Sequence, residues 1–213
     1  MKHDVCYITF TVKPLEEPMR SDEQLIEADR QDVFTSRQLR KAFGKFATGV
    51  TVVTCDAPDG TPHGATVNAF TAVSLDPPLA QVTLIRGNKV CEYLENAPFA
   101  INILAEDQAD VALNFAGVAM KQEVQWRENN SVPVLEGNAA TLQCKPWRIY
   151  DGGDHLIVIG EVTHIKVNDV EPLLFVSGKF RHTGRFVQGT PWEGSGDSLS
   201  FGWFEEPNIF TSF

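Results

Sequence analysis

Most of the chain after Gly49 is a series of short apolar runs rich in β-branched residues, each closed by a turn signal. The run VTVVTC (50–55) is followed by DAPDGTP, and the run LAQVTLI (79–85) is followed by RGNK. Runs of this length and composition are typical of β-strands, and Pro, Asp-Gly and Gly-Asn steps are typical of turns. Many short strands at steady spacing predict a mainly β protein that forms a closed antiparallel barrel.

The same signals place the individual elements along the chain. Strands are expected at 50–55, 63–78, 79–85, 98–106, 140–154, 155–169 and 172–184. Helical spacing of apolar residues predicts helices at 35–47, 90–97 and 107–117. The first helix has Thr35 as its expected N-cap and an apolar face that we expect to pack on a sheet. A polar segment at 120–130 is expected to be mobile and to cover a site.

One domain is expected to hold these elements. Of the 213 residues, 43% are hydrophobic and 22% are charged, which favours a packed core over disorder. Residues 1–34 become rich in proline and charge and are predicted to be an extension outside the core. Residues 35–187 are predicted to form the barrel domain, and residues 188–213 a peripheral tail rich in glycine, serine and aromatic residues.

Charge and cysteine content exclude several classes of partner. A net charge of -10 disfavours nucleic acids, because affinity for a phosphate backbone comes largely from Lys and Arg. No segment of about 18 apolar residues and no export signal is present, so we expect no membrane span. The cysteines lack C-x-x-C or zinc-ligand spacing, which predicts no metal site and reduced thiols in a cytoplasmic protein. These cysteines are Cys6, Cys55, Cys91 and Cys144.

The stretch HGATVNAFTAVSLDPP (63–78) has much hydrogen-bonding capacity for an otherwise apolar segment. Asn68, Thr71 and Ser74 bring amide and hydroxyl groups, and small residues surround them. A flavin pocket needs such donors along one edge of the ring and small residues elsewhere to admit the ring. A barrel strand with a polar outer face and a bulge at Gly64 has the same pattern, and these residues alone leave both interpretations open.

Three segments in order carry a family resemblance. FATGVTVVT, DGTPHGATVNAFTAVSLDPPL and FAINIL together resemble the flavin reductase family, the short FMN-binding split barrels that serve two-component flavin monooxygenases. The resemblance runs from about Leu39 to Phe180. It implies a mainly β fold, a split β-barrel of Greek-key antiparallel type with a few flanking helices. It also implies a homodimer with sites near the subunit interface.

The resemblance implies a position for each ligand. Gly153, Asp154 and His155 match the family's Gly-Asp-His triplet, so His155 is the implied catalytic contact that orients the nicotinamide. The turn at 86–89, before a helix N-terminus, is the implied phosphate site, with Asn88 and Lys89 where relatives usually carry serine or threonine. The strand PLLFVSGKF has Val-Ser at 176–177 in place of an aromatic or basic pair. The residues implied to bind the flavin are Thr66, Val67, Asn68, Ala69, Phe70, Thr71, Ser74, Arg86, Asn88, Lys89, Phe115 and Gly117.

The implied activity is NAD(P)H-dependent reduction of FMN or FAD. A hydride passes from C4 of the nicotinamide of NADH or NADPH to N5 of the flavin, and the reduced flavin goes to a separate oxygenase or halogenase. Backbone donors at 68–70 are expected to stabilise charge at the flavin edge, with Thr66 and Ser74 as helpers. Two alternatives stay open. One is a flavin-binding electron carrier or sensor without steady-state turnover, and the other is an enzyme resembling pyridoxamine-phosphate oxidase, which needs more basic residues for a second phosphate.

Overall fold

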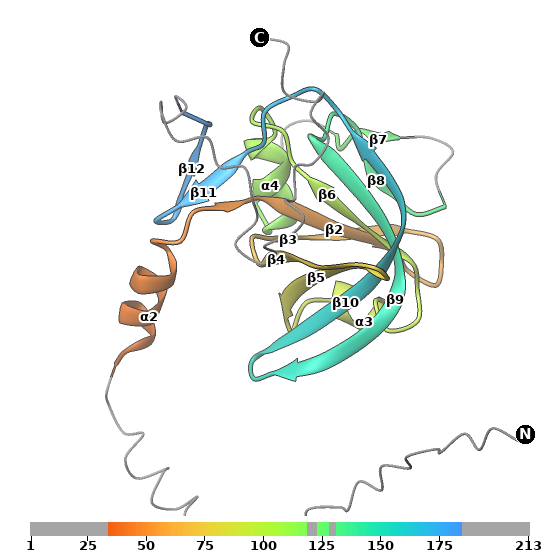
Figure 1. Cartoon of the computed structure of the whole chain (residues 1–213), viewed down its shortest axis with the longest axis horizontal. Coiled ribbons are helices and arrows are strands. Elements are labelled where there is room, and N and C mark those ends of the chain that lie inside the picture. Colours follow the sequence, from red (N-terminus) through yellow and green to blue (C-terminus); the bar gives the residue numbers. More distant parts are fainter. Residues whose placement is uncertain (1–33, 119–122, 128–130, 185–213) are drawn as a thin grey trace, which may run out of the picture. The chain divides into compact units, whose positions relative to one another are not determined.

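The computed structural model describes residues 34–118, 123–127 and 131–184 (Figure 1). By their contacts, the residues up to Phe46 form one unit and the residues from Ala47 form another. The predicted extension and tail lie almost wholly outside the described residues, as does most of the segment at 120–130 that we expected to be mobile. The predicted domain boundaries therefore stay predictions.

The first unit contains helix α2 (Ser36–Phe43), which begins at the predicted N-cap. The Thr35 hydroxyl accepts a hydrogen bond from the Gln38 N–H at 3.2 Å, and the Gln38 side chain accepts one from the Thr35 N–H at 2.7 Å. These reciprocal bonds form a capping box that satisfies two backbone donors. No residue of α2 is buried, and Phe43 is 70% exposed, so packing of its apolar face on a sheet stays a prediction.

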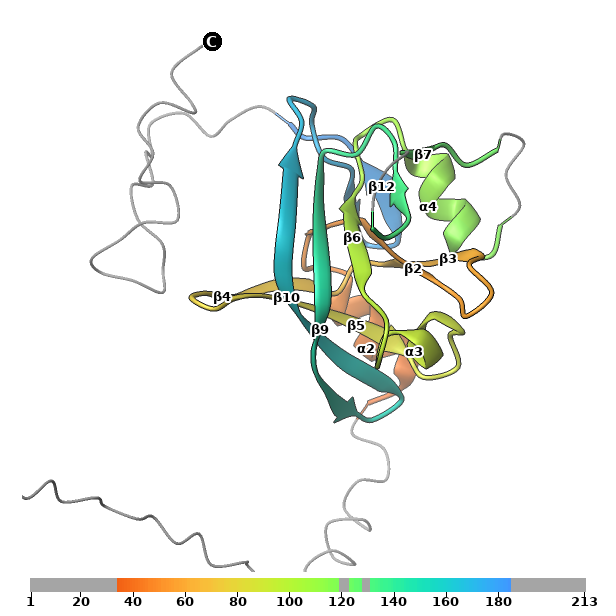
Figure 2. The ribbon, with the colours of Figure 1, turned by 90° about the vertical axis from the view of Figure 1, so that its right-hand side faces the viewer.

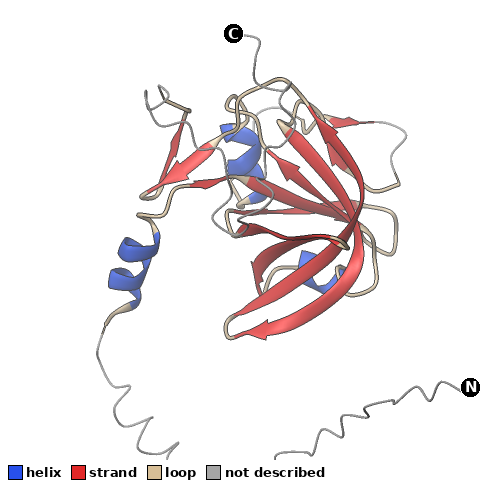
Figure 3. Cartoon of the chain, viewed as in Figure 1, coloured by secondary structure: helices blue, strands red, loops and turns tan. Residues whose placement is uncertain are grey.

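The second unit consists mainly of strands, as predicted (Figure 3). Its helices are α3 (Val90–Tyr93) and α4 (Ala109–Phe115). Its strands are β1 (Thr48–Gly49), β2 (Thr51–Asp56), β3 (Pro62–Val67), β4 (Phe70–Leu75), β5 (Pro78–Ile85), β6 (Phe99–Ile103), β7 (Trp126–Arg127), β8 (Val134–Leu135), β9 (Ala140–Gly152), β10 (His155–Val167), β11 (Leu174–Val176) and β12 (Lys179–Arg181).

Seven of these strands form one antiparallel sheet in the order β3-β2-β6-β9-β10-β5-β4. The sheet is strongly curled, and the long pair β9 and β10 runs through its middle (Figures 1 and 2). Within the described residues no ladder joins the edge strands β3 and β4, so the expectation of a closed barrel is wrong. The fold is a mainly β split barrel, open between these two edges. Smaller sheets are formed by β1, β11 and β12 and by β7 and β8.

Two predicted strands are each a pair of strands. The segment 63–78 divides at Asn68-Ala69 into β3, which pairs with β2, and β4, which pairs with β5. The segment 172–184 forms the hairpin β11–β12, with φ of 50° at Ser177 and 76° at Gly178. Two consecutive positive φ values are typical of a type I′ hairpin turn. Periodicity along one strand does not detect either reversal.

Strand β2 is buried on both faces and separates two apolar clusters. Val53 and Cys55 belong to the cluster inside the curl of the sheet, which also contains α3 residues Val90 and Cys91. Val52 belongs to the other cluster, together with Ala112 of α4. A strand buried on both faces is typically a continuous run without polar alternation, and β2 is such a run of Val, Thr and Cys at 51–55.

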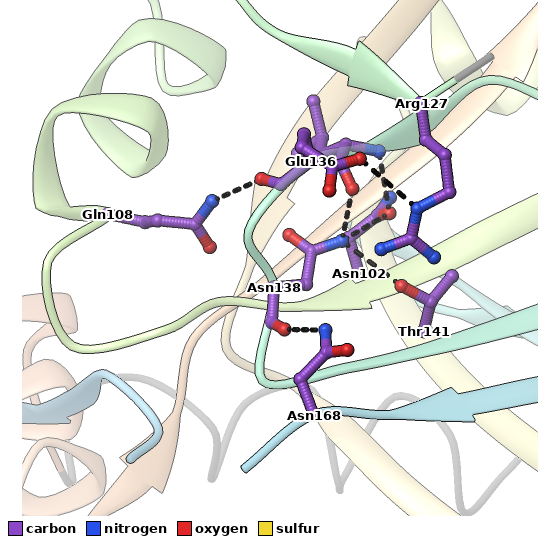
Figure 4. A network of polar contacts seen from close by, with 8 residues as sticks. Asn102, Gln108, Arg127, Glu136, Asn138, Thr141 and Asn168 are labelled. Carbon is purple, nitrogen blue, oxygen red and sulfur yellow. Dashed lines mark hydrogen bonds and ion pairs between the residues drawn. The ribbon is translucent and has the colours of Figure 1, made fainter. Parts of the chain in front are cut away.

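A network of buried amides joins β2, β6 and the turn before β9 (Figure 4). The Asn102 side chain donates to Val52 O and Thr54 Oγ1, both at 2.9 Å. Its oxygen accepts from Leu135 N–H at 3.1 Å and from Asn138 Nδ2 at 2.9 Å. All four bonds of a fully buried amide are therefore made, which fixes the relative position of three segments. None of these side-chain contacts of Asn102 was predicted from the sequence.

Candidate active site

The first part of the predicted flavin site is the two-residue link between the sheet edges. Asn68 and Ala69 are exposed, and Ala69 O accepts a hydrogen bond from Thr83 N–H of β5 at 3.0 Å. Val67 O accepts from the Thr51 hydroxyl at 2.9 Å. These two bonds fix both ends of the link. It thus presents backbone and amide groups to solvent without an acidic side chain, which is the donor set that a flavin edge needs.

Helix α4 lies against β3 and brings two predicted residues together. The Thr66 hydroxyl donates to Ala112 O at 2.6 Å. The Phe115 ring occupies the space above Gly64, since a Cβ on that glycine would lie 2.6 Å from Phe115 Cε1. The ladder is regular at Gly64, so the bulge considered there is absent; the glycine makes room for a ring. The ring also packs edge-on against Trp126, with centroids 6.1 Å apart.

Gly117 follows α4 with φ of +92°, as expected for the residue that ends a helix. The residues predicted on β4 lie farther away. Thr71 and Ser74 stand opposite Gln81 and Leu79, at the start of β5. Leu79 and Arg86 are seven residues apart, about 23 Å along an extended strand. The structure therefore brings Thr66 and Phe115 together and leaves Ser74 apart from the turn at Arg86.

The predicted phosphate turn follows β5. The Asn88 side-chain oxygen accepts from Val90 N–H at 3.0 Å, and the backbone carbonyls of Asn88 and Lys89 accept from the N–H groups of Cys91 and Glu92. The first amides of α3 are thus already used, so this short helix offers no cluster of donors to an anion. The groups left for a phosphate are the Lys89 ammonium, the Asn88 amide nitrogen and the backbone N–H groups of Gly87 and Lys89.

Gly153 and Asp154 of the triplet form the two-residue turn between β9 and β10, and His155 is the first residue of β10. Gly153 has φ of +78°, and His155 pairs with Gly152 across the hairpin. A glycine with positive φ at the first turn position is typical of a type II′ turn. His155 Nδ1 lies 2.6 Å from Asp154 Oδ1, and the imidazole is 40% exposed. This hydrogen bond lowers the pKa of Asp154 and uses one imidazole nitrogen, which leaves the other for a ligand.

Arg86 joins the two predicted turns. Its Nε donates to Gly153 O at 2.7 Å, its backbone N–H donates to Asp154 O at 3.1 Å, and its guanidinium pairs with the Asp151 carboxylate. Asp151 Oδ1 also accepts from Gly153 N–H at 2.9 Å. That bond and the Arg86 charge lower the pKa of Asp151. Asp151 was not among the predicted site residues, although an Asp two residues before a turn glycine is a common signal for such a bond.

Strand β5 connects the two parts of the site. Thr83, which holds the link at Ala69, and Arg86, which holds the Gly-Asp-His turn, are three residues apart, about 10 Å along the strand. The His63 ring of β3 and the Tyr93 ring of α3 are in tilted contact, with centroids 5.4 Å apart. The predicted flavin link and nicotinamide turn therefore border the same end of one strand.

Other chemistry is limited in the described part of the chain. No group of three or more metal-ligating side chains occurs there, and none of its helices has the length and hydropathy to span a membrane. The described cysteines are free and buried, and burial raises the pKa of Cys55 to about 11 and of Cys144 to about 12. These thiols are protonated near neutral pH and are poor nucleophiles.

Comparison with known proteins identifies the class. A family described as "Flavin reductase like domain" matches residues 43–184. The NADH-dependent flavin reductase of a Rhodococcus species is 40% identical over 163 residues, which cover 74% of this chain and 92% of that protein. The structure of flavin reductase PheA2 matches with a TM-score of 0.68 and 41% identity, over 71% of this chain and all of that one.

A third similar protein is BorF, the flavin reductase component of a bacterial two-component tryptophan halogenase. Its structure matches with a TM-score of 0.64 and 36% identity, over 71% of this chain and 100% of that chain. The matched region contains the strands, the link, the helix α4 and the Gly-Asp-His turn described above. The chain belongs to the flavin reductase-like family.

Proposed function

We propose that this protein is an NADH-dependent reductase of free FMN or FAD. The reduced nicotinamide loses a hydride from C4, and N5 of the flavin gains it, so that NADH is oxidised as the flavin is reduced. The name of the Rhodococcus relative supports NADH as the donor. The observation that carries the proposal is that the His155 turn and the Asn68-Ala69 link border the same end of β5.

The residues of the chain would act by position and hydrogen bonding. The link at 68–70 would donate to the edge of the flavin where negative charge increases. His155, held through Nδ1 by Asp154, would orient the nicotinamide carboxamide with its other nitrogen. Lys89 and the Asn88 amide would hold the flavin phosphate. Phe115 and Gly117 would border the entrance for the second substrate.

We also propose that a separate oxygenase or halogenase receives the reduced flavin. BorF is such a component in a halogenase system, and the whole of its structure matches 71% of this chain. A cytoplasmic location is part of the same proposal. It is supported by the free, buried thiols of the described region, since reduced cysteines are typical of that compartment.

A homodimer is the proposed assembly. Val73 and Leu75 on β4, and Ile165 and Val167 on β10, are exposed apolar residues. Ile165 and Val167 have the spacing of one strand face. Exposed apolar residues on two strands favour contact with a second copy. Leu75→Asp is expected to convert a dimer to a monomer in sedimentation velocity, and a wild-type monomer at micromolar concentration would contradict the proposal.

The test of the activity is the loss of NADH absorbance at 340 nm with FMN or FAD added in excess. Turnover that depends on added flavin supports the proposal. A yellow protein that keeps its flavin and does not turn over NADH favours the carrier or sensor instead.

His155→Ala is expected to raise the KM for NADH about tenfold, which corresponds to one lost interaction of about 1.4 kcal/mol. The matched control is His164→Ala, an exposed histidine on the same strand, nine residues from His155. An unchanged KM and kcat in the His155 variant would exclude the role.

A further inference from the structure

One arginine holds both carbonyls of the Gly153-Asp154 turn and a carboxylate of the strand that precedes it. Arg86 contacts the Gly153 carbonyl through Nε, the Asp154 carbonyl through its backbone N–H, and the Asp151 carboxylate through its guanidinium. Asp151 in turn binds the Gly153 N–H with its other oxygen. Both backbone carbonyls of the turn and one of its amides are therefore fixed by this pair.

The turn needs such support because little else covers it. Gly152, Gly153 and Asp154 are all exposed, and no cluster of buried residues in the described part of the chain includes them. A two-residue hairpin tip at the end of long strands moves unless side chains hold it. His155 is the next residue along the chain, and its own hydrogen bond goes to Asp154, so movement of the turn moves the imidazole.

We propose that Arg86 is a positioning residue for the nicotinamide side of the reaction, acting through Asp151 and the turn on His155, and that it does not bind the flavin phosphate. This inference rests on the proposed function. It reassigns a residue that the family resemblance places at the flavin. Lys89, three residues further along, is the cation left for the phosphate.

The chemistry of the contacts requires arginine. A guanidinium presents several N–H groups in one plane, so it reaches a carbonyl and a carboxylate at once. A lysine ammonium at the same position is a single point donor on a flexible chain. The two side chains are exposed, and exposed ion pairs contribute little to folding, so we expect the pair to matter for geometry more than for stability.

The test compares Arg86→Lys, Asp151→Asn and the double variant. Each single variant is expected to raise the KM for NADH about five- to tenfold, with kcat and the KM for flavin within twofold of wild type. The double variant is expected to be no worse than the more affected single one, because both changes break one interaction. Asp151→Asn is decisive, since an amide in place of a carboxylate keeps the shape and removes the charge.

Glu161→Gln is the matched control. Glu161 pairs with Lys145 at 2.9 Å across the same two strands, away from the turn, so its loss is expected to leave both KM values unchanged. A raised flavin KM in Arg86→Lys with an unchanged NADH KM in Asp151→Asn would overturn the inference and return Arg86 to the flavin phosphate.

A second readout separates this inference from the proposed function. Hydrogen exchange at the Gly153 and Arg86 amides, measured by NMR, is expected to be at least tenfold faster in Arg86→Lys and Asp151→Asn than in wild type. Unchanged exchange would refute the positioning role even if the enzyme were active. Absence of NADH turnover in the wild-type protein would refute the proposed function while the exchange data still decided whether the pair holds the turn.

Discussion

Gly64→Ala tests whether the Phe115 ring packs against Gly64 of β3 as closely as the structure indicates. A Cβ at this position would lie 2.6 Å from Phe115 Cε1, 2.7 Å from Cδ1 and 3.2 Å from Thr54 Cγ2. Carbon atoms in contact normally lie about 3.5–4.0 Å apart, so the ring must move by about 1 Å. The ring also packs edge-on against Trp126, which limits that movement.

We expect the substitution to lower the free energy of unfolding by about 1–3 kcal/mol, the usual cost of overpacking. For a unit of this size, that corresponds to a Tm about 2–12 °C lower. Because Phe115 also borders the predicted flavin site, the KM for flavin is expected to rise. Urea unfolding followed by circular dichroism measures the first effect, and the NADH assay measures the second.

Gly49→Ala is the matched control, because Gly49 is an exposed strand residue without a positive φ, and no atom lies within 4 Å of the position that an alanine methyl group would take. Alanine there is expected to leave the free energy of unfolding unchanged or to raise it by about 0.5–1 kcal/mol, since a glycine within a strand lowers stability by about that amount. Phe115→Leu combined with Gly64→Ala is expected to be less destabilised than the sum of the two single changes. Equal stability of the Gly64 and Gly49 variants would refute the argument.

Two further predictions concern the core. Asn102→Ala leaves the buried Leu135 N–H without its acceptor and removes the three other hydrogen bonds of the Asn102 side chain, and we expect a loss of about 2–5 kcal/mol in urea unfolding. A loss below about 1 kcal/mol, with wild-type melting cooperativity, would contradict this account. The raised thiol pKa values predict that stability is full below about pH 9 and falls as the pH rises toward 11 and 12, because the unfolded thiols lose protons first. Cys144→Ala is expected to flatten that decline, and parallel curves for variant and wild type between about pH 8 and pH 10.5 would refute it.

The sequence predicts the local elements well because their signals are local. Thr35 caps α2, VTVVTC forms β2, and Gly117 ends α4 with positive φ, each from a few neighbouring residues. The Gly-Asp-His turn also lies at its predicted place between two strands. The hairpin at Ser177-Gly178 has a signal too, since a Ser-Gly step is typical of a turn, but the apolar residues around that step favour one longer strand.

What the sequence does not predict is which segments meet. The division of 63–78 at Asn68 depends on two partners, β2 and β5, that pair with opposite edge strands of the sheet. The contact of Arg86 with Asp151 joins residues 65 positions apart, and the Asn102 network joins residues up to 50 apart. Such contacts follow from strand order, which periodicity does not contain. A charged turn therefore resembles a phosphate site in the sequence, whereas its arginine binds the neighbouring hairpin.

The strand order has a consequence for the newly made chain. Strands β4 and β5 form a local hairpin, but the other neighbour of β5 is β10, which begins at His155, 70 residues after β5 ends at Ile85. At about 5–20 residues per second, a ribosome needs about 4–14 s to make that intervening length. Until β10 has been made, the edge of β5 that contains Val82 and Leu84 has unpaired backbone N–H and C=O groups. The chain is thus exposed to aggregation while the ribosome makes the residues between β5 and β10, and slow or interrupted translation of that segment prolongs the exposure.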